Sequence, residues 1–305
     1  MDSTLVAKAI AWLQVVKPTL IRASEQTARW ISTNKLGALA AVVLLLELKR
    51  LPFAWHFRVF RNIWWPKKGY FEPKPGSIFK PVVTPSRVAV LEMDYNLHKS
   101  NSTYFSDLDV ARTDLLAAMR AAAIRGGLYK EYKNGVMILL AGASCTFKKE
   151  IKPGATFDMY SRILTWDRKW LYVVTHFVEK RKGVDSYTYE PWKNTEDGKA
   201  ASKPPVLFAT AISKCVVKAG RLTVPPAKFF KAAGVLQPDT EPADPGAKEE
   251  SEDEGKAHDT AASESTDAEG WTWSKVEDER IRALQWADGF AGGLDAAHEQ
   301  FHALR

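Results

Sequence analysis

The chain has 305 residues, 46% of them hydrophobic and 26% charged, which excludes a wholly disordered protein and allows one sizeable domain with attachments. Its net charge of +7 conceals a split, because residues 236–270 carry −10 and the rest of the chain +17. The positive surplus predicts an anionic partner: a membrane, a phosphate-bearing ligand or nucleic acid.

Residues 1–69 contain the most apolar run of the chain, LGALAAVVLLL at 36–46. Alone, the run is too short to cross about 30 Å of hydrocarbon, which takes about 20 helical residues, but its extension back to Trp30 leaves a short spanning helix open. After Glu47, which ends the run, residues 48–68 hold aromatic and basic side chains and no acid, a composition typical of a membrane headgroup belt. We therefore expect 1–69 to be a membrane-associated helical segment rather than a nucleic-acid surface. A short spanning helix, an interfacial helix and a buried helix remain open.

The charges on either side of this run predict its orientation. Residues 48–68 hold six basic and no acidic side chains, whereas residues 1–35 hold five basic and two acidic ones. The positive-inside rule then places the C-terminal flank in the cytosol. The sequon at 101–103 agrees, because a lumenal location would invite a glycan there. We expect a membrane-associated protein whose globular domain faces the cytosol, with the endoplasmic reticulum as one candidate membrane.

Residues 70–235 have the pattern of a globular α+β domain. A strand is predicted at 87–94, and a long helix at 101–124 with apolar residues at three- and four-residue steps and a stop at Gly126 and Gly127. Turn signals separate four further strands, at 136–147, 156–165, 170–178 and 206–217. A long helix followed by consecutive strands predicts an antiparallel sheet that wraps the helix.

Two attachments follow the domain. Residues 236–270 are rich in Pro, Gly, Ala, Ser and Glu, which predicts a disordered acidic linker. Residues 271–305 have the pattern of a C-terminal helix that docks on the core or on a partner.

The residues around the start of the long helix suggest chemistry. The carboxylate of Asp94 precedes the helix N-terminus, where free amides near Ser100 and Asn101 offer hydrogen-bond donors and partial positive charge. Such amides polarise a thioester carbonyl while a carboxylate attacks it or deprotonates a water. An ordinary helix cap explains Ser100 and Asn101 equally well, so the spacing alone leaves both interpretations open.

The same region resembles the signature of hotdog-fold acyl-CoA thioesterases of the 4-hydroxybenzoyl-CoA type. That signature has an Asp, a His four positions later, small polar residues, an aromatic residue, an acid and an Ala-Arg pair, which here are Asp94, His98, Ser100, Asn101, Tyr104, Asp109, Ala111 and Arg112. Within the superfamily the sequence is similar to the membrane-anchored group that includes thioesterase superfamily member six. The resemblance covers about residues 87–229 and not the acidic tail. It departs from the pattern at Leu97, where the family usually has glycine, and at Ser100, where it has asparagine.

The resemblance implies a hotdog fold, a homodimer with sites at the seam between protomers, and hydrolysis of acyl-CoA or another acyl thioester, with a fatty acyl group favoured. Asp94 would be the nucleophile or general base, the Asn101 amide would polarise the carbonyl, and His98 would orient the Asp94 loop or bind substrate. Asp109 stands where relatives have Glu, with an ion pair to Arg112 as the alternative. Ser100, Tyr104 and Arg112 are candidate substrate contacts, although a core position is favoured for Tyr104.

Other chemistries have weaker support. Cys145 and Cys215 cannot form a disulfide framework, and the pattern of His298, Glu299 and His302 lacks the context of a zinc peptidase, so we expect no metal. No phosphate-binding glycine loop occurs, so we expect no cofactor. His176 is interpreted as a core histidine. The rival function is a non-catalytic acyl-lipid-binding or scaffolding protein at a membrane; a hydratase using Asp94 and His98 fits the Ala111-Arg112 context less well.

Overall fold

The computed structural model describes residues 3–66, 74, 76–132, 135–180, 206–237 and 272–303, and its contacts divide the chain into two units. Unit 1 comprises the residues up to Ala54 together with Ala89–Leu91, and unit 2 comprises Trp55–Val88 and the chain from Glu92 onward. The predicted acidic linker lies outside the described residues, apart from its first two.

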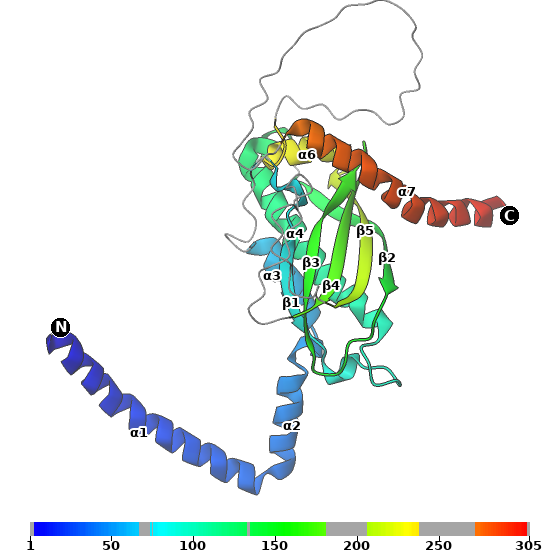
Figure 1. Ribbon diagram of the computed structural model, residues 1–305. Coiled ribbons are helices and arrows are strands. Elements are labelled where there is room, and N and C mark those ends of the chain that lie inside the picture. Colours follow the sequence, from blue (N-terminus) through cyan, green and yellow to red (C-terminus); the bar gives the residue numbers. More distant parts are fainter. Residues whose placement is uncertain are drawn as a thin grey trace, which may run out of the picture. The chain divides into compact units, whose positions relative to one another are not determined.

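Unit 1 is helical (Figure 1). It contains α1 (Ser3–Thr33), α2 (Lys35–Leu46) and the short turn η1 (Leu48–Arg50). No residue of α2 is buried, although its sequence is the apolar run. None of the helices that the structure describes has both the length and the apolar character of a membrane span.

The strand predicted at 87–94 is wrong. The first strand, β1 (Val82–Arg87), ends where the prediction begins, and Val90–Glu92 form the turn η3. The backbone amides of Val90 and Leu91 donate to the buried carboxylate of Glu47, at 2.7 and 3.1 Å, and therefore are not available to a sheet ladder. The stretch is apolar like a strand, and the contact that prevents strand pairing comes from a side chain more than forty residues away, so the local pattern does not reveal it.

Unit 2 is built on one antiparallel sheet with the strand order β1-β3-β4-β5-β2, and β6 pairs with β5. The later strands are β2 (Met137–Phe147), β3 (Thr156–Trp166), β4 (Trp170–Glu179), β5 (Leu207–Ala219) and β6 (Leu222–Val224). The four predicted strands are confirmed within two residues at each end, because a turn signal bounds most of them. The remaining elements are α3 (Ala54–Trp64), η2 (Ser77–Phe79), α4 (Asn101–Ala123), η4 (Ile124–Leu128), α5 (Tyr129–Glu131), α6 (Pro226–Ala232) and α7 (Trp273–Ala303).

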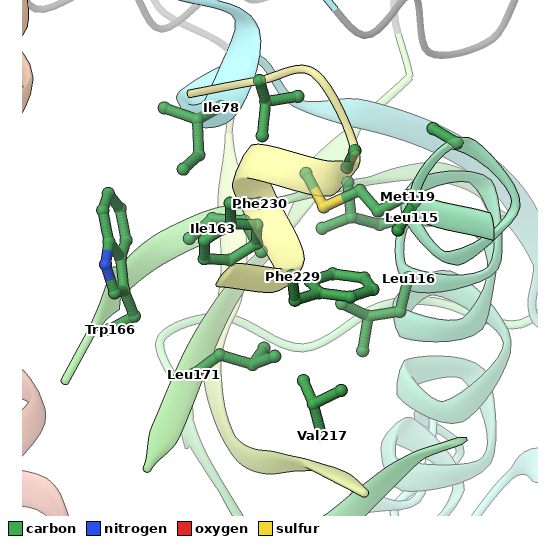
Figure 2. Close-up of a cluster of buried hydrophobic side chains, with 14 of the residues drawn as sticks. Ile78, Leu115, Leu116, Met119, Ile163, Trp166, Leu171, Val217, Phe229 and Phe230 are labelled. Atoms are coloured by element: carbon green, nitrogen blue, oxygen red, sulfur yellow. The ribbon is translucent and has the colours of Figure 1, made fainter. Parts of the chain in front are cut away.

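The long helix α4 packs on one face of the sheet, and this helix-wrapping antiparallel sheet has the hotdog-like arrangement that the sequence predicted. Figure 2 shows Phe229 and Phe230 of α6 between α4 and the strands. Small side chains along α4 allow a close approach, and a Cβ at Gly126 would lie only 1.8 Å from the carbonyl oxygen of Ala232. The predicted stop at Gly126 and Gly127 therefore also marks the place where α6 crosses the helix end.

The predicted C-terminal helix is α7, and its first half covers the other face of the sheet. Successive strand residues point to opposite faces. Ile163 and Val173 accordingly belong to the cluster beneath α4, whereas Leu164 and Val174 pack with Ala283 of α7. The core thus has two layers, one on each side of the sheet. Two polar contacts fix α7: the Thr165 hydroxyl donates to the Arg280 carbonyl at 2.7 Å, and the Arg280 guanidinium donates to the Trp166 carbonyl at 2.9 Å.

Replacement of Ala283 by Glu is expected to destabilise this outer layer. Ala283 is fully buried against strand side chains, so the substitution places an unpaired carboxylate in an apolar contact. We expect Ala283→Glu to lower the free energy of unfolding, measured by urea titration, by at least about 2 kcal/mol. The matched control is Ile281→Glu, at an exposed position of the same helix, which should change the free energy by less than about 0.5 kcal/mol. Equal losses in the two variants would contradict the docking of α7.

Candidate active site

A buried ion network lies beneath the start of α4. The ammonium group of Lys99 is 3.3 Å from a carboxylate oxygen of Glu92 and 2.9 Å from one of Asp107, and all three side chains are fully buried. Asp107 also accepts a hydrogen bond from Ser86 at 3.3 Å and pairs with Arg58 of α3 at 3.4 Å. The network therefore ties the residues just before α4 to its second turn, to β1 and to α3.

Residues 94–98, between Glu92 and Lys99 of this network, form a tight turn. One oxygen of Asp94, Oδ1, accepts the backbone amides of Asn96 at 2.9 Å and His98 at 3.4 Å, and the Asp94 amide donates to the His98 carbonyl at 2.9 Å. Leu97 has a φ of 60°, in the left-handed region that favours glycine. A residue with a Cβ costs about 1 kcal/mol or more in this conformation, which a glycine would adopt without strain.

The Asp94 turn and the first residue of α4 line one cavity of about 310 Å³, called here the N-terminal cavity. Oδ2 of Asp94 accepts no hydrogen bond from any residue that the structure describes. The backbone amide of Asn101 likewise donates to no described residue, because it lies in the first turn of α4. Asp94 and Asn101, the residues that carry these two groups, therefore line the same cavity. The cavity is lined by Asp94, Asn96, His98, Lys99, Asn101, Tyr104, Phe147, Lys148, Lys149 and Glu150.

Ser100 and Tyr104 support the site in different ways. Ser100 is the N-cap of α4, but its side chain makes no capping bond; its amide donates to the Glu92 carbonyl at 2.7 Å. Tyr104 touches the cavity with a nearly buried ring, whose centroid is 5.0 Å from those of Phe147 and Phe177. Burial raises the pKa of Tyr104, so the phenol stays protonated at neutral pH. Its position agrees with the core interpretation.

Asp109 and Arg112 do not line the N-terminal cavity. They form an ion pair on α4, the alternative that the sequence left open, and Arg112 also donates to the Ser213 hydroxyl of β5 at 3.1 Å. Both line a second cavity, between α3, α4 and β2. The structure therefore brings together Asp94, His98, Asn101 and Tyr104 of the predicted site residues, and places Asp109 and Arg112 two turns further along the helix.

Burial shifts the pKa values of three other side chains: His176, Cys145 and Cys215. Burial, aided by the nearby Arg162, lowers the pKa of His176 to about 4, so its imidazole is neutral and bonds the Thr210 hydroxyl at 3.1 Å. Burial raises the pKa values of Cys145 and Cys215 to about 11, which suppresses the nucleophilic thiolate. In the described part of the chain, no group of three or more metal-ligating side chains could hold a metal ion.

The sequence prediction missed two sets of residues. Lys148, Lys149 and Glu150 line the N-terminal cavity; the charged run directly after a predicted strand was the available signal. Glu92, Lys99 and Asp107 were missed because charged side chains are usually exposed. A sign of the second set is that Asp107 lies among the buried and mostly apolar residues of α4.

Comparisons with known proteins show which family the chain resembles in sequence. The profile of the thioesterase-like superfamily matches residues 88–217. Thioesterase poxG of Penicillium oxalicum is 32% identical over 302 residues, which cover 92% of each chain. Protein THEM6 of Danio rerio is 26% identical over 133 residues, 43% of this chain and 61% of the relative. A solved 4-hydroxybenzoyl CoA thioesterase from Pseudomonas sp. strain CBS-3 matches 50% of this chain and 99% of its own, with 15% identity and a TM-score of 0.33.

Removal of the Lys99 cation is expected to destabilise the site and the fold together. Lys99→Met keeps the length of the side chain but leaves the carboxylates of Glu92 and Asp107 buried without it. Breaking a buried ion pair in this way costs roughly 3–5 kcal/mol of unfolding free energy, measured by urea titration. Lys152→Met, at an exposed position, is the control and should be nearly neutral. A Lys99→Met protein as stable as the control would show that the network does not hold this end of α4.

Proposed function

The chain belongs to the thioesterase-like superfamily, and from this membership we propose that it hydrolyses acyl thioesters in the N-terminal cavity, with Asp94 and the backbone amide of Asn101 as the reacting and polarising groups. One observation carries the assignment to these residues: Asp94 and Asn101 line the same cavity, and neither Oδ2 of Asp94 nor the Asn101 amide hydrogen-bonds another described residue. The prediction of the superfamily from the sequence is confirmed.

The chemistry follows from where charge develops. When the thioester carbonyl is attacked, its oxygen becomes negative, and a helix N-terminal amide stabilises that charge without reorganisation. Oδ2 of Asp94 either attacks the carbonyl carbon, giving an anhydride that water then cleaves, or removes a proton from the attacking water. In both routes the carbon–sulfur bond breaks, the sulfur leaves and is protonated to a thiol, and the acid is released. The bonds to Oδ1 hold the carboxylate in place.

We propose coenzyme A as the carrier and a fatty acyl chain as the acyl group. Lys148 and Lys149 line the cavity with exposed side chains. Ammonium groups at a cavity mouth suit phosphates, which coenzyme A carries. The excess of positive charge outside the acidic stretch agrees with an anionic substrate.

We also propose a homodimer that forms through β2. This strand, eleven residues long, stands at an edge of the sheet and exposes Met137, Leu139 and Leu140. A long apolar edge strand is a template for pairing with a second chain. The other edge strand, β1, has six residues and contains Pro85, so it is a poorer template.

Membrane association is a further part of the proposal. The apolar side chains of α2 are solvent-exposed, and α3 exposes Phe57 at 68%, Phe60 at 42% and Trp64 at 65%. The residues 57, 60 and 64 share one face of a helix, and Arg61 beside them is also exposed. Aromatic rings with neighbouring cations are typical of a helix that lies in a membrane interface.

The double substitution Phe57→Ser with Trp64→Ser is expected to weaken binding of the full chain to vesicles of anionic phospholipid at least tenfold in a co-sedimentation assay. Two large rings lose their burial in lipid, and each fully buried aromatic side chain contributes roughly 2 kcal/mol. Tyr129→Ser with Trp286→Ser removes two exposed rings elsewhere and is the control. Vesicle binding that survives both double substitutions equally would exclude α3 as the membrane contact.

Asp94→Asn is expected to reduce kcat on acyl-CoA substrates by at least about 100-fold, because loss of a general base or nucleophile typically costs 10²–10⁴ in rate. The control is Asp167→Asn. Its Oδ1 also accepts two backbone amides in a turn, those of Lys169 and Trp170 at 2.6 Å, but it lies outside the N-terminal cavity. The pair of variants therefore separates the chemistry of a carboxylate from its role in shaping a turn.

The kcat of both variants is measured by thiol release from a panel of acyl-CoAs of different chain lengths. Turnover that Asp94→Asn leaves unchanged contradicts the assignment of Asp94. Acyl-CoA binding without turnover by the unsubstituted chain would instead favour the non-catalytic acyl-binding protein.

A further inference from the structure

Helix α3 has a second apolar face, opposite the exposed aromatic one. Trp55, Val59 and Ile63, at steps of four residues, line the second cavity, whereas Phe57, Phe60 and Trp64 point the other way around the helix. The helix is fixed in this orientation by the buried side chain of Val59 and by the pair between Arg58 and Asp107.

The second cavity, called here the α3–α4 cavity, has a volume of about 350 Å³. This volume is at the lower end of the ~300–1,000 Å³ of small-molecule sites. Most of its wall is apolar: the α3 residues face Leu116 and Ala117 of α4, and β2 adds three more apolar side chains. The full lining is Trp55, Val59, Ile63, Asp109, Arg112, Thr113, Leu116, Ala117, Arg120, Met137, Ile138, Leu140 and Cys215.

The charged groups of the cavity wall already have partners within the protein. Asp109 pairs with Arg112, which also donates to Ser213, and Arg120 donates to the Val136 carbonyl at 3.3 Å. The thiol of Cys215 stays protonated, because burial raises its pKa to about 11. A polar ligand would have to compete for these groups, whereas an apolar one would not.

Apolar side chains at the cavity are nevertheless exposed to solvent. Trp55 is exposed, and Met137 and Leu140, which belong to the edge strand of the proposed dimer, are about half-exposed in the single chain. Leaving apolar area in water costs about 25 cal/mol per Å², so a mostly apolar hollow of this kind indicates a binding site.

We propose that the α3–α4 cavity binds the alkyl tail of the acyl substrate, with α3 as the wall that limits tail length. The inference rests on the proposed thioesterase function. The cavity begins at Asp109, eight residues beyond Asn101 on the same helix, a distance of about 12 Å at 1.5 Å per residue. A tail that fills this cavity while its carbonyl lies at Asn101 must be long. The wall itself lies outside residues 88–217, so the family profile does not determine it.

Two substitutions that fill the cavity from opposite walls test the proposal in the full chain. Ile63→Trp acts from α3 and Thr113→Phe from α4. Their controls are Ile281→Trp on α7 and Thr223→Phe on β6, which make the same exchanges at positions that line neither cavity.

The probe for direct binding is a long-chain polyene fatty acid whose fluorescence rises in apolar surroundings. Hydrolysis of hexadecanoyl-CoA and butanoyl-CoA gives the second readout.

Both filling variants should weaken binding of the fatty acid at least tenfold and lower kcat/KM for hexadecanoyl-CoA by a similar factor, with butanoyl-CoA hydrolysis changed less than twofold. The two controls should match the unsubstituted chain in all three measurements. In another outcome, the unsubstituted chain binds the fatty acid but hydrolyses neither substrate, while both filling variants lose fatty-acid binding. In that case the cavity assignment stands and the proposed activity fails.

Three results would overturn the proposal. In the first, the filling variants bind the fatty acid as tightly as their controls. In the second, a folded variant loses both hydrolytic activities equally, which indicates a structural effect. In the third, Thr113→Phe converts a dimer into a monomer, measured by light scattering, without weakening fatty-acid binding, which would assign the cavity to contact with a second copy of the chain.

Discussion

The site depends on the buried ion pairs that the ammonium group of Lys99 makes with two carboxylates. The ammonium group lies between the carboxylates of Glu92, before the Asp94 turn, and Asp107, on the second turn of α4. Buried ion pairs contribute little net stability, because desolvation offsets the attraction, but the loss of one partner is severely destabilising. The pairing therefore acts mainly by fixing geometry: the chain on both sides of the Asp94 turn is held, and the first amides of α4 are held with it.

The same helix serves three purposes through different parts of its surface. One face, rich in small side chains, packs against the sheet. The N-terminus offers a donor to the N-terminal cavity, and a third side forms a wall of the α3–α4 cavity. This division requires that the polar side chains on α4 have partners within the protein. Asp107 pairs with Lys99. Arg112 pairs with Asp109 and donates a hydrogen bond to Ser213. A helix with a uniformly apolar buried surface would lack the anchors that orient it.

Sequence patterns predicted most of the fold because its elements are punctuated locally. Turn residues such as Gly135, Gly154 and Asp167 separate the strands, and apolar spacing identifies α4 and α7. The strand at 87–94 failed because the amides of Val90 and Leu91 bind Glu47, a contact that no local pattern records. The motif predicted that Asp94, His98 and Asn101 belong together, and these three residues line one cavity. The Lys99 network and the lining by Lys148 and Lys149 depend on long-range packing and were missed.

We propose that an acyl carbonyl bound beside Asp94 is polarised by the N-terminus of α4. The most direct test is the infrared stretching frequency of a carbon-13-labelled thioester carbonyl bound to the Asp94→Asn protein, compared with the same thioester in water. Hydrogen bonding from the Asn101 amide in the helix field should lower the frequency on binding. A bound carbonyl whose frequency is unchanged or raised would contradict the account.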